Sequence, residues 1–221
     1  LWKQGLEKVS TEYKQEQISR AEFVKEEKRM IEEVVRKITA EIVLNPEGLH
    51  SFDLRHILQY KEANVLGFAQ LAYLLCKSAG LSAQIINAIE RGNVTLQRGR
   101  GYAVCMVRLN DATEVTLDFR LTPAVSEAFT FGEIFAKDGN YWKAREGSRR
   151  YGKIQLLDAK AYRAFIYDAL AECHFVRGNY EKAIECCSEA LKYSDILASV
   201  YYNRGTTRCI LQQYAEAVSD F

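Results

Sequence analysis

Residues 60–88 read YKEANVLGFAQLAYLLCKSAGLSAQIINA and carry the strongest structural signal of the chain. Within them, residues 65–76 are apolar nearly all round, and Ala, Leu and Phe favour helix there. A helix without a polar face is a buried helix. Gly80 stands where a left-handed helix stop is common, and Ile85 and Ile86 follow it in a β-prone run. The sequence therefore predicts a buried central helix, a glycine turn and a strand packed beside the helix.

Small and aromatic residues recur around this predicted helix. They are Phe68, Ala69, Leu71, Ala79, Gly80, Leu81, Ala83 and Gln84, with Ala63 ahead of the helix. The pattern resembles the core of the transglutaminase-like superfamily of papain-like cysteine hydrolases and acyl transferases. There, Gly-x-Cys-x-x-Phe-Ala-x-Leu opens a buried helix, and Ala-Gly-(Ile/Leu)-x-Ala-(Arg/Gln) precedes a strand. The resemblance implies an α+β transglutaminase-like (papain-like) core over residues 45–125, with Ala63 in place of the opening Gly.

The same resemblance implies where a catalytic triad would stand. Val65 occupies the position of the nucleophilic Cys. Gly101-Tyr102-Ala103-Val104 is similar to the family's Gly-His-Ala-aromatic motif, so Tyr102 occupies the position of the His. Asp118, in the run EVTLDF, matches the third member. Of the three triad positions, Asp118 alone keeps the family's residue.

The chemistry of acyl transfer decides what this loss means, because it needs a thiolate and a base that holds the proton. Val65 has no nucleophilic atom, and the phenol of Tyr102 titrates, unperturbed, at about 10. Cys76 lies eleven residues along the helix from Val65, roughly 16 Å away by the helical rise. Cys105 follows Tyr102 by three residues on one strand, so it points to the opposite face. We therefore expect a pseudoenzyme without catalytic residues, in which Asp118 is a structural acceptor.

Composition narrows the class of protein. The 221 residues suggest one or two domains, and 48% hydrophobic residues can form a good core. A net charge of +1 recruits neither nucleic acid nor a membrane. The six Cys include no CxxC pair and the three His are scattered, so we expect no metal, no cofactor and no small-molecule substrate. Without a signal peptide or a long apolar run, we expect a cytoplasmic or nuclear protein, of which this sequence is a fragment.

The segments on either side of the helix complete the predicted division of the chain. Residues 1–44 form a helical segment, in which Ser19 caps an amphipathic helix. Residues 45–125 form the degenerate core, with a hairpin around Asn110-Asp111. Residues 126–160 are less regular and are predicted to be a connector.

Two stretches are basic. The loop 91–101 (RGNVTLQRGRG) offers three Arg to an anion, although a hairpin tip is the default interpretation. The stretch 143–153 is the other, and it carries Lys143, Arg145, Arg149, Arg150 and Lys153. Tyr141, Trp142 and Tyr151 are interleaved with these cations, so one hypothesis is a nucleic-acid contact. A solvated connector that packs its aromatic residues on the fold is the interpretation that we prefer.

From about residue 161 the sequence repeats itself with a period of 34 residues. The pairs are Tyr167 with Tyr201, Ala171 with Gly205, Tyr180 with Tyr214, Ala183 with Ala217 and Cys187 with Phe221. The period and the pattern of small and aromatic residues resemble tetratricopeptide repeats (TPRs). The resemblance implies helical hairpins over residues 161–221, of which the second is incomplete.

TPR arrays bind peptides or partner helices mostly on a concave face formed by the first helix of each repeat. The resemblance places five residues there: Asp168, Glu172, Tyr202, Asn203 and Thr206. Asp168 and Glu172 would repel a carboxylate, so we do not expect these repeats to hold the C-terminal tail of a chaperone. The alternative is that this face packs on other parts of the protein.

The function expected from these observations is a non-catalytic protein–protein interaction scaffold. Its partners would be proteins, bound by the TPR face or by the degenerate cleft around Val65 and Tyr102. One alternative is an active cysteine hydrolase or acyl transferase whose nucleophile lies elsewhere. The other is a nucleic-acid-associated factor that uses residues 143–153.

Overall fold

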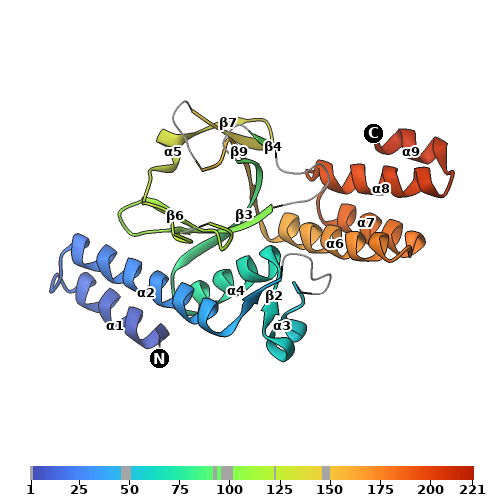
Figure 1. Ribbon diagram of the computed structural model, residues 1–221. Helices are drawn as coiled ribbons and strands as arrows, with labels where there is room; N and C mark the ends of the chain where they lie inside the picture. The colour runs from blue at the N-terminus through green and yellow to red at the C-terminus, as the bar shows by residue number, and fades with distance from the viewer. Residues whose placement is uncertain (1, 46–50, 92–93, 96–101, 122, 146–149) are drawn as a thin grey trace. The chain divides into compact units, whose positions relative to one another are not determined.

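The computed structural model describes residues 2–45, 51–91, 94–95, 102–121, 123–145 and 150–221 (Figure 1). The chain divides into two compact units. Unit 1 holds Leu1–Ile86, Ala103–Lys137 and Lys143–Ser148. Unit 2 holds Asn87–Tyr102, Asp138–Trp142 and Arg149–Phe221. The N-terminal region is thus mixed α+β, and the C-terminal segment of unit 2 is helical, as the sequence predicts.

The strands form two sheets. Their bounds are β1 (Val43–Leu44), β2 (Glu62–Ala63), β3 (Ser82–Arg91), β4 (Val94–Thr95), β5 (Tyr102–Arg108), β6 (Glu114–Leu117), β7 (Phe135–Asp138), β8 (Tyr141–Ala144) and β9 (Lys153–Leu157). β1 and β2 pair in parallel. In the larger sheet the strand order is β6-β5-β3-β9-β8-β7, with β4 on β3. β5 pairs with β6 and β3 with β4 in antiparallel register.

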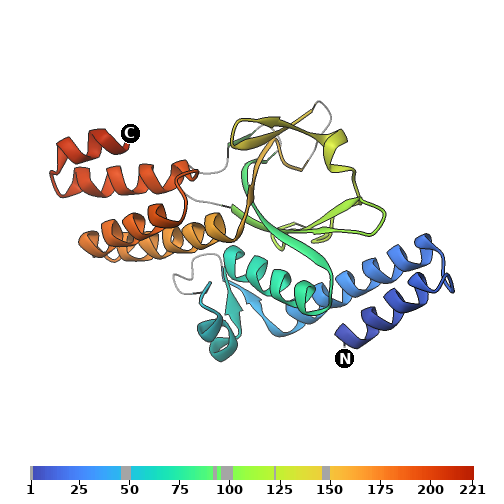
Figure 2. The ribbon, with the colours of Figure 1, turned by 180° about the vertical axis from the view of Figure 1, so that it is seen from behind.

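Two antiparallel helices, α1 (Trp2–Lys14) and α2 (Arg20–Glu41), open unit 1 and lie side by side in both views (Figures 1 and 2). A capping box of Ser19 and Glu22 starts α2, which confirms the predicted cap. The rings of Tyr13 and Phe23 stack 5.1 Å apart and hold the two helices together. The apolar stripe of α2 is buried, and α2 packs on α4.

The hairpin predicted around Asn110-Asp111 is present between β5 and β6, and α2 holds its turn. The buried carboxylate of Glu27 accepts a hydrogen bond from the Asn110 N–H at 2.8 Å. The guanidinium of Arg20 donates to the Asn110 carbonyl at 2.6 Å. Glu27 and Arg20 are seven residues apart, which places them on one face of α2. α2 therefore packs within unit 1 on both α4 and the β5–β6 turn.

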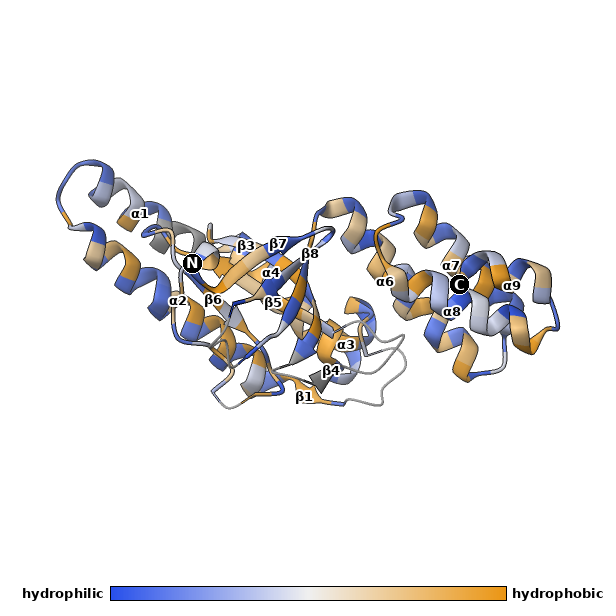
Figure 3. Cartoon of the chain, turned by 90° about the horizontal axis from the view of Figure 1, so that it is seen from above, coloured by the Kyte–Doolittle hydropathy of each residue, from blue (hydrophilic) through white to orange (hydrophobic). Residues whose placement is uncertain are grey.

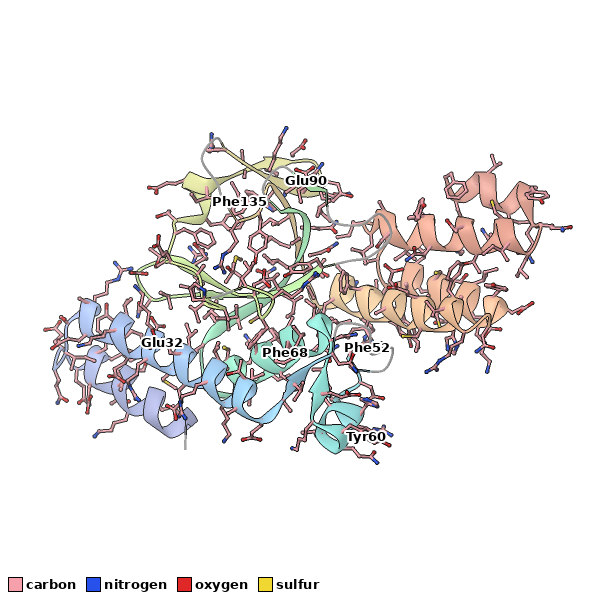
Figure 4. The ribbon with its side chains drawn as sticks, viewed as in Figure 1. Glu32, Phe52, Tyr60, Phe68, Glu90 and Phe135 are labelled. Carbon is pink, nitrogen blue, oxygen red and sulfur yellow. The ribbon has the colours of Figure 1, made fainter. Side chains whose placement is uncertain are left out.

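The central helix α4 (Val65–Ser78) matches the prediction, and the shorter α3 (Leu54–Tyr60) precedes it. Gly80 ends the turn with φ +89°, the left-handed conformation that glycine tolerates. Phe68 is buried, and its ring lies 4.8 Å from that of Phe119. Figure 4 shows Phe68 among packed side chains, whereas Tyr60 lies on the outside at the end of α3. Burial on most of its surface explains why α4 needs no polar face.

Residues 126–160, which the sequence predicts to be a connector, contain regular secondary structure. The short helix α5 (Phe131–Ile134) and the strands β7, β8 and β9 lie there, and all three strands belong to the larger sheet. Gly139, with φ +59°, turns β7 into β8. These strands have four or five residues each, and β7 and β8 bury only Phe135 fully, so they have only a weak alternating pattern.

Four helices form the C-terminal segment: α6 (Ala159–Val176), α7 (Tyr180–Tyr193), α8 (Ala198–Ile210) and α9 (Tyr214–Asp220). They stack as two helical hairpins, with α8 against both α6 and α7 (Figure 1). Small residues are buried where the helices approach each other: Ala164, Ala171, Ala183, Ala190, Gly205 and Ala217. In the part of the chain that the structure describes, no helix has the length and apolar character to cross a membrane.

Candidate functional site

The three residues that the sequence resemblance places at triad positions stand at the start of a helix, on a strand and just after a strand. Val65 is the first residue of α4 and is half-buried. Tyr102 begins β5, is buried, and its backbone N–H donates to the side-chain oxygen of Asn87 at 3.1 Å. Asp118 is buried after β6 and accepts a hydrogen bond from the Arg120 N–H at 3.1 Å. Tyr102 belongs to unit 2 and the other two to unit 1, so each is placed within its own unit.

The start of α4 is closely packed on the segment that precedes it. The Asn64 side chain accepts from the Gly67 N–H at 3.0 Å, and the Asn64 N–H donates to the Ser51 carbonyl at 2.8 Å. A Cβ at Gly67 would lie 2.2 Å from that carbonyl oxygen and 2.8 Å from Cδ1 of Ile57. The Asn64 side chain thus caps one of the free N–H groups that would otherwise face a ligand at this helix end.

Three buried thiols, those of Cys105, Cys173 and Cys187, have raised pKa values. The hydrogen bond with Cys76, followed by burial, raises the pKa of the Cys105 thiol well above its usual value. Burial raises the pKa of Cys173 to about 11 and that of Cys187 further still. Because the thiolate is the reactive form, these groups would stay protonated near neutral pH.

Asp168 was predicted to face a partner, but the structure places its carboxylate between α6 and α8. Ser199 donates to it at 2.7 Å and Asn203 at 2.8 Å. Burial raises the pKa of Asp168 to about 6, although both hydrogen bonds act in the opposite direction. The TPR pattern places Asp168 and Asn203 on one face. Because the two residues are 35 positions apart in the sequence, the hydrogen bond between them was not predicted. Asp168 is therefore a contact within the repeat stack.

The other residues predicted for the concave face lie on α6 and α8. Tyr202 is exposed, and Glu172, Asn203 and Thr206 are half-buried. Of these, Asn203 already contacts Asp168. Tyr202 and Thr206, four residues apart on α8, are thus the predicted pair with the least involvement in the α6–α8 contact.

Two exposed apolar residues that were not predicted lie at the ends of the first helices, Val176 on α6 and Ile210 on α8. They are 34 residues apart, so the repeat period was the signal that could have found them. They add apolar surface to the segment that carries Tyr202.

A cluster of charges between α8 and α9 was also missed. Arg204 donates three hydrogen bonds to the buried carboxylate of Asp220, at 2.6, 3.0 and 3.1 Å. Arg208 donates to the same carboxylate at 2.7 Å. The ring of Tyr201 lies 5.9 Å from the Arg204 guanidinium. This cluster holds α9 on α8, and its side chains are directed inward.

The basic stretch at residues 143–153 is only partly available to an anion. Lys153 lies 4.3 Å from the centre of the Tyr141 ring and 3.7 Å from the carboxylate of Asp138. Its charge is therefore paired within the fold. Arg149 and most of the Arg-rich loop at 91–101 lie outside the described residues.

Comparison with known proteins identifies one part of the chain. Residues 164–195, which cover most of α6 and all of α7, match the family model of the tetratricopeptide repeat. No solved structure matches the chain. The match confirms the TPR prediction for the first repeat, and a TPR supports protein–protein interaction.

Proposed function

We propose that the chain is a non-catalytic scaffold that binds other proteins through its TPR segment. The observation that carries the proposal is the repeat match at residues 164–195, joined to a second hairpin at the same period. The partner contacts the first helices of the repeats, at Tyr202 and Thr206, with Glu172 beside them. Asp168 and Asn203 support this surface from below because they join α6 to α8.

The α+β region is proposed to be an inactive transglutaminase-like domain, whose former cleft docks a peptide or a domain. Two facts support this: the helix, strand and hairpin follow the order that the resemblance implies, and Val65 offers no nucleophile. The raised pKa values of the buried thiols also argue against a displaced nucleophile. Labelling by a thiol-reactive active-site probe, abolished by one Cys→Ala change, would overturn this part of the proposal.

The experiment that tests partner binding is affinity capture from lysate with the double variant Tyr202→Ala/Thr206→Ala. Asn203 stays unchanged, because its removal would leave the buried carboxylate of Asp168 with one donor fewer. Tyr60→Ala is the matched control, since Tyr60 is also an exposed Tyr and lies on α3, outside the helical segment. Partners lost only with the double variant support the proposal. Partners that every variant retains would contradict binding at Tyr202 and Thr206.

A further inference from the structure

The first helices of the two repeats carry matching rows of side chains on the face of the proposed function. Glu172 and Val176 lie four residues apart on α6, and Thr206 and Ile210 lie at the equivalent positions of α8, 34 residues later. Because residues four apart share one face of a helix and α6 packs on α8, these side chains form two rows across the helices. Glu172 and Thr206 form the polar row, and Val176 and Ile210 form the apolar row. Figure 3 shows hydrophilic and hydrophobic residues next to each other along both helices.

The apolar row is exposed even where a further hairpin packs on the repeat. Val176 is 54% exposed although α8 packs against both α6 and α7. Ile210 at the equivalent position is 46% exposed. By contrast, Phe165 on α6 and Val200 on α8 are buried. The exposure of the apolar row is therefore a property of this position in the repeat.

The charge beside the apolar row is negative. Glu172 stands in the polar row, and its charge adds to the rise that burial causes in the pKa of Asp168, one turn earlier on α6. Above about pH 6 Asp168 is ionised as well, and the donors that it receives from α8, Ser199 and Asn203, are neutral. Arg177 adds a positive charge on the other side of the apolar row, at the C-cap of α6. The face is therefore complementary to a partner with a cation over the polar row and apolar side chains over the next row.

The spacing of the rows fits a helix. The rows are four residues apart, which is about 6 Å along α6 and α8. A partner helix that runs along them repeats its own side chains at the same spacing. Packed helices lie about 8–10 Å apart, so one helix in the groove between α6 and α8 contacts both. An extended segment is narrower, since neighbouring strands lie about 4.8 Å apart, and it would contact one helix only.

We propose that the partner of the TPR face is an amphipathic helix in which a Lys or Arg is followed, three and four residues later, by two apolar residues. The cation lies over Glu172, and the two apolar side chains lie over Val176 and Ile210. The partner helix runs parallel to α6, and its recognition is that of a helix in a groove. This inference rests on the proposed function and names the kind of partner that its surface takes.

The test uses a labelled synthetic peptide, an Ala- and Gln-rich helix that carries a Lys and two Leu in this spacing. Its binding to the intact chain is followed by fluorescence anisotropy. The double variant Val176→Gln/Ile210→Gln should weaken binding at least about tenfold, because it removes the apolar contacts. Val218→Gln is the matched control, since Val218 is an exposed Val on α9 outside both rows, and it should leave the affinity within about twofold. Thermal unfolding checks that each variant is folded.

Two further peptides test the charge and the helix. A peptide with Glu in place of the Lys should bind at least about tenfold more weakly, and Glu172→Lys should reverse the preference between the two. A peptide with a central Pro, which breaks the helix, should not bind measurably. The proposal is overturned if the Lys peptide does not bind, if either altered peptide binds as tightly as it does, or if the double variant and Val218→Gln have equal effects.

These outcomes are separate from the test of the proposed function. If lysate partners depend on Tyr202 and Thr206 while the Lys peptide does not bind, the helical partner is overturned and the scaffold proposal stands. Self-association of the chain that Val176→Gln/Ile210→Gln abolishes would also overturn the helical partner. The apolar row would then belong to an interface between two copies of the chain.

Discussion

The two repeats of the helical segment are both helical hairpins with small residues buried at equivalent positions, but they differ in the contacts between their helices. In the first repeat, Leu170 of α6 and Cys186 of α7 are both half-buried and uncharged. In the second repeat the same two positions are Arg204 and Asp220, which form an ion pair at 2.6 Å. The buried small residues at equivalent places, such as Ala183 and Ala217, do not change. Close approach of the helices thus defines the repeat, and the contacts around it can be apolar or ionic.

Removing the carboxylate of Asp220, which Arg204 and Arg208 share, should have the largest effect on stability. Asp220→Ala leaves the guanidinium groups of Arg204 and Arg208 without their common acceptor, which costs about 3–5 kcal/mol for a buried cluster. The equivalent change in the first repeat, Cys186→Ala, should cost about 1 kcal/mol, since it removes one half-buried sulfur. Native-state hydrogen exchange of the α6–α9 amides measures both.

Asp220→Asn is the control for this comparison, because it keeps the shape and one acceptor of the side chain. It should cost less than Asp220→Ala. Equal costs for Asp220→Ala and Cys186→Ala would mean that the ion cluster contributes no more than an apolar contact.

The stability of the contact between α6 and α8 should depend on pH, because Asp168 lies in that contact. Its pKa is raised from 3.8 to about 6 in the folded chain, chiefly by burial. Between about pH 4 and pH 6 the folded state therefore keeps a proton that the unfolded state has lost. The free energy of unfolding should fall by at most about 3 kcal/mol as the pH rises through this window. Above about pH 6, Asp168 should cause no further change in it.

Asp168→Asn removes the titrating group, so its unfolding free energy should lack this slope. Thermal unfolding of both chains across the window makes the measurement. Parallel profiles of unfolding free energy against pH for the two chains would show that Asp168 does not cause the pH dependence.

The smallest effects are expected at the paired small residues. Ala171→Gly should cost about 1 kcal/mol from helix propensity. Gly205→Ala should be close to neutral, although the new Cβ would lie 2.9 Å from the Phe221 ring. That ring is exposed and can move aside, while the helix gains propensity. A loss of more than about 1 kcal/mol for Gly205→Ala would show that the Phe221 ring, or the Cβ of Asp220 at 3.2 Å from the new Cβ, does not give way.

Sequence reasoning located the elements that have a long or periodic pattern. The helix at residues 65–76 is apolar all round, and the repeat returns its aromatic and small residues after 34 positions. Both patterns can be recognised in the sequence without knowing which residues these helices contact in the fold. The strands of residues 126–160 have only four or five residues each, which is too short for such a pattern.

The candidate site was harder to predict, because its chemistry depends on pairs that are distant in sequence. The sequence around Asp168 does not indicate that its carboxylate accepts hydrogen bonds from Ser199 and Asn203. Glu27 sits among charged residues of α2, and only the turn at Asn110 explains why it is buried. Composition and periodicity assign a residue to a face, and the partner across that face decides whether it is available.

The bond between Glu27 and the turn at Asn110 also bears on how the chain can be shortened. A chain that begins at Asn45 would lose α2, and with it the contacts that bridge 83 positions of sequence to the β5–β6 turn. The Asn110 N–H would lose its acceptor, and the face of α4 that packs on α2 would be exposed. The shortest fragment of the α+β region that folds should therefore begin no later than Ser19.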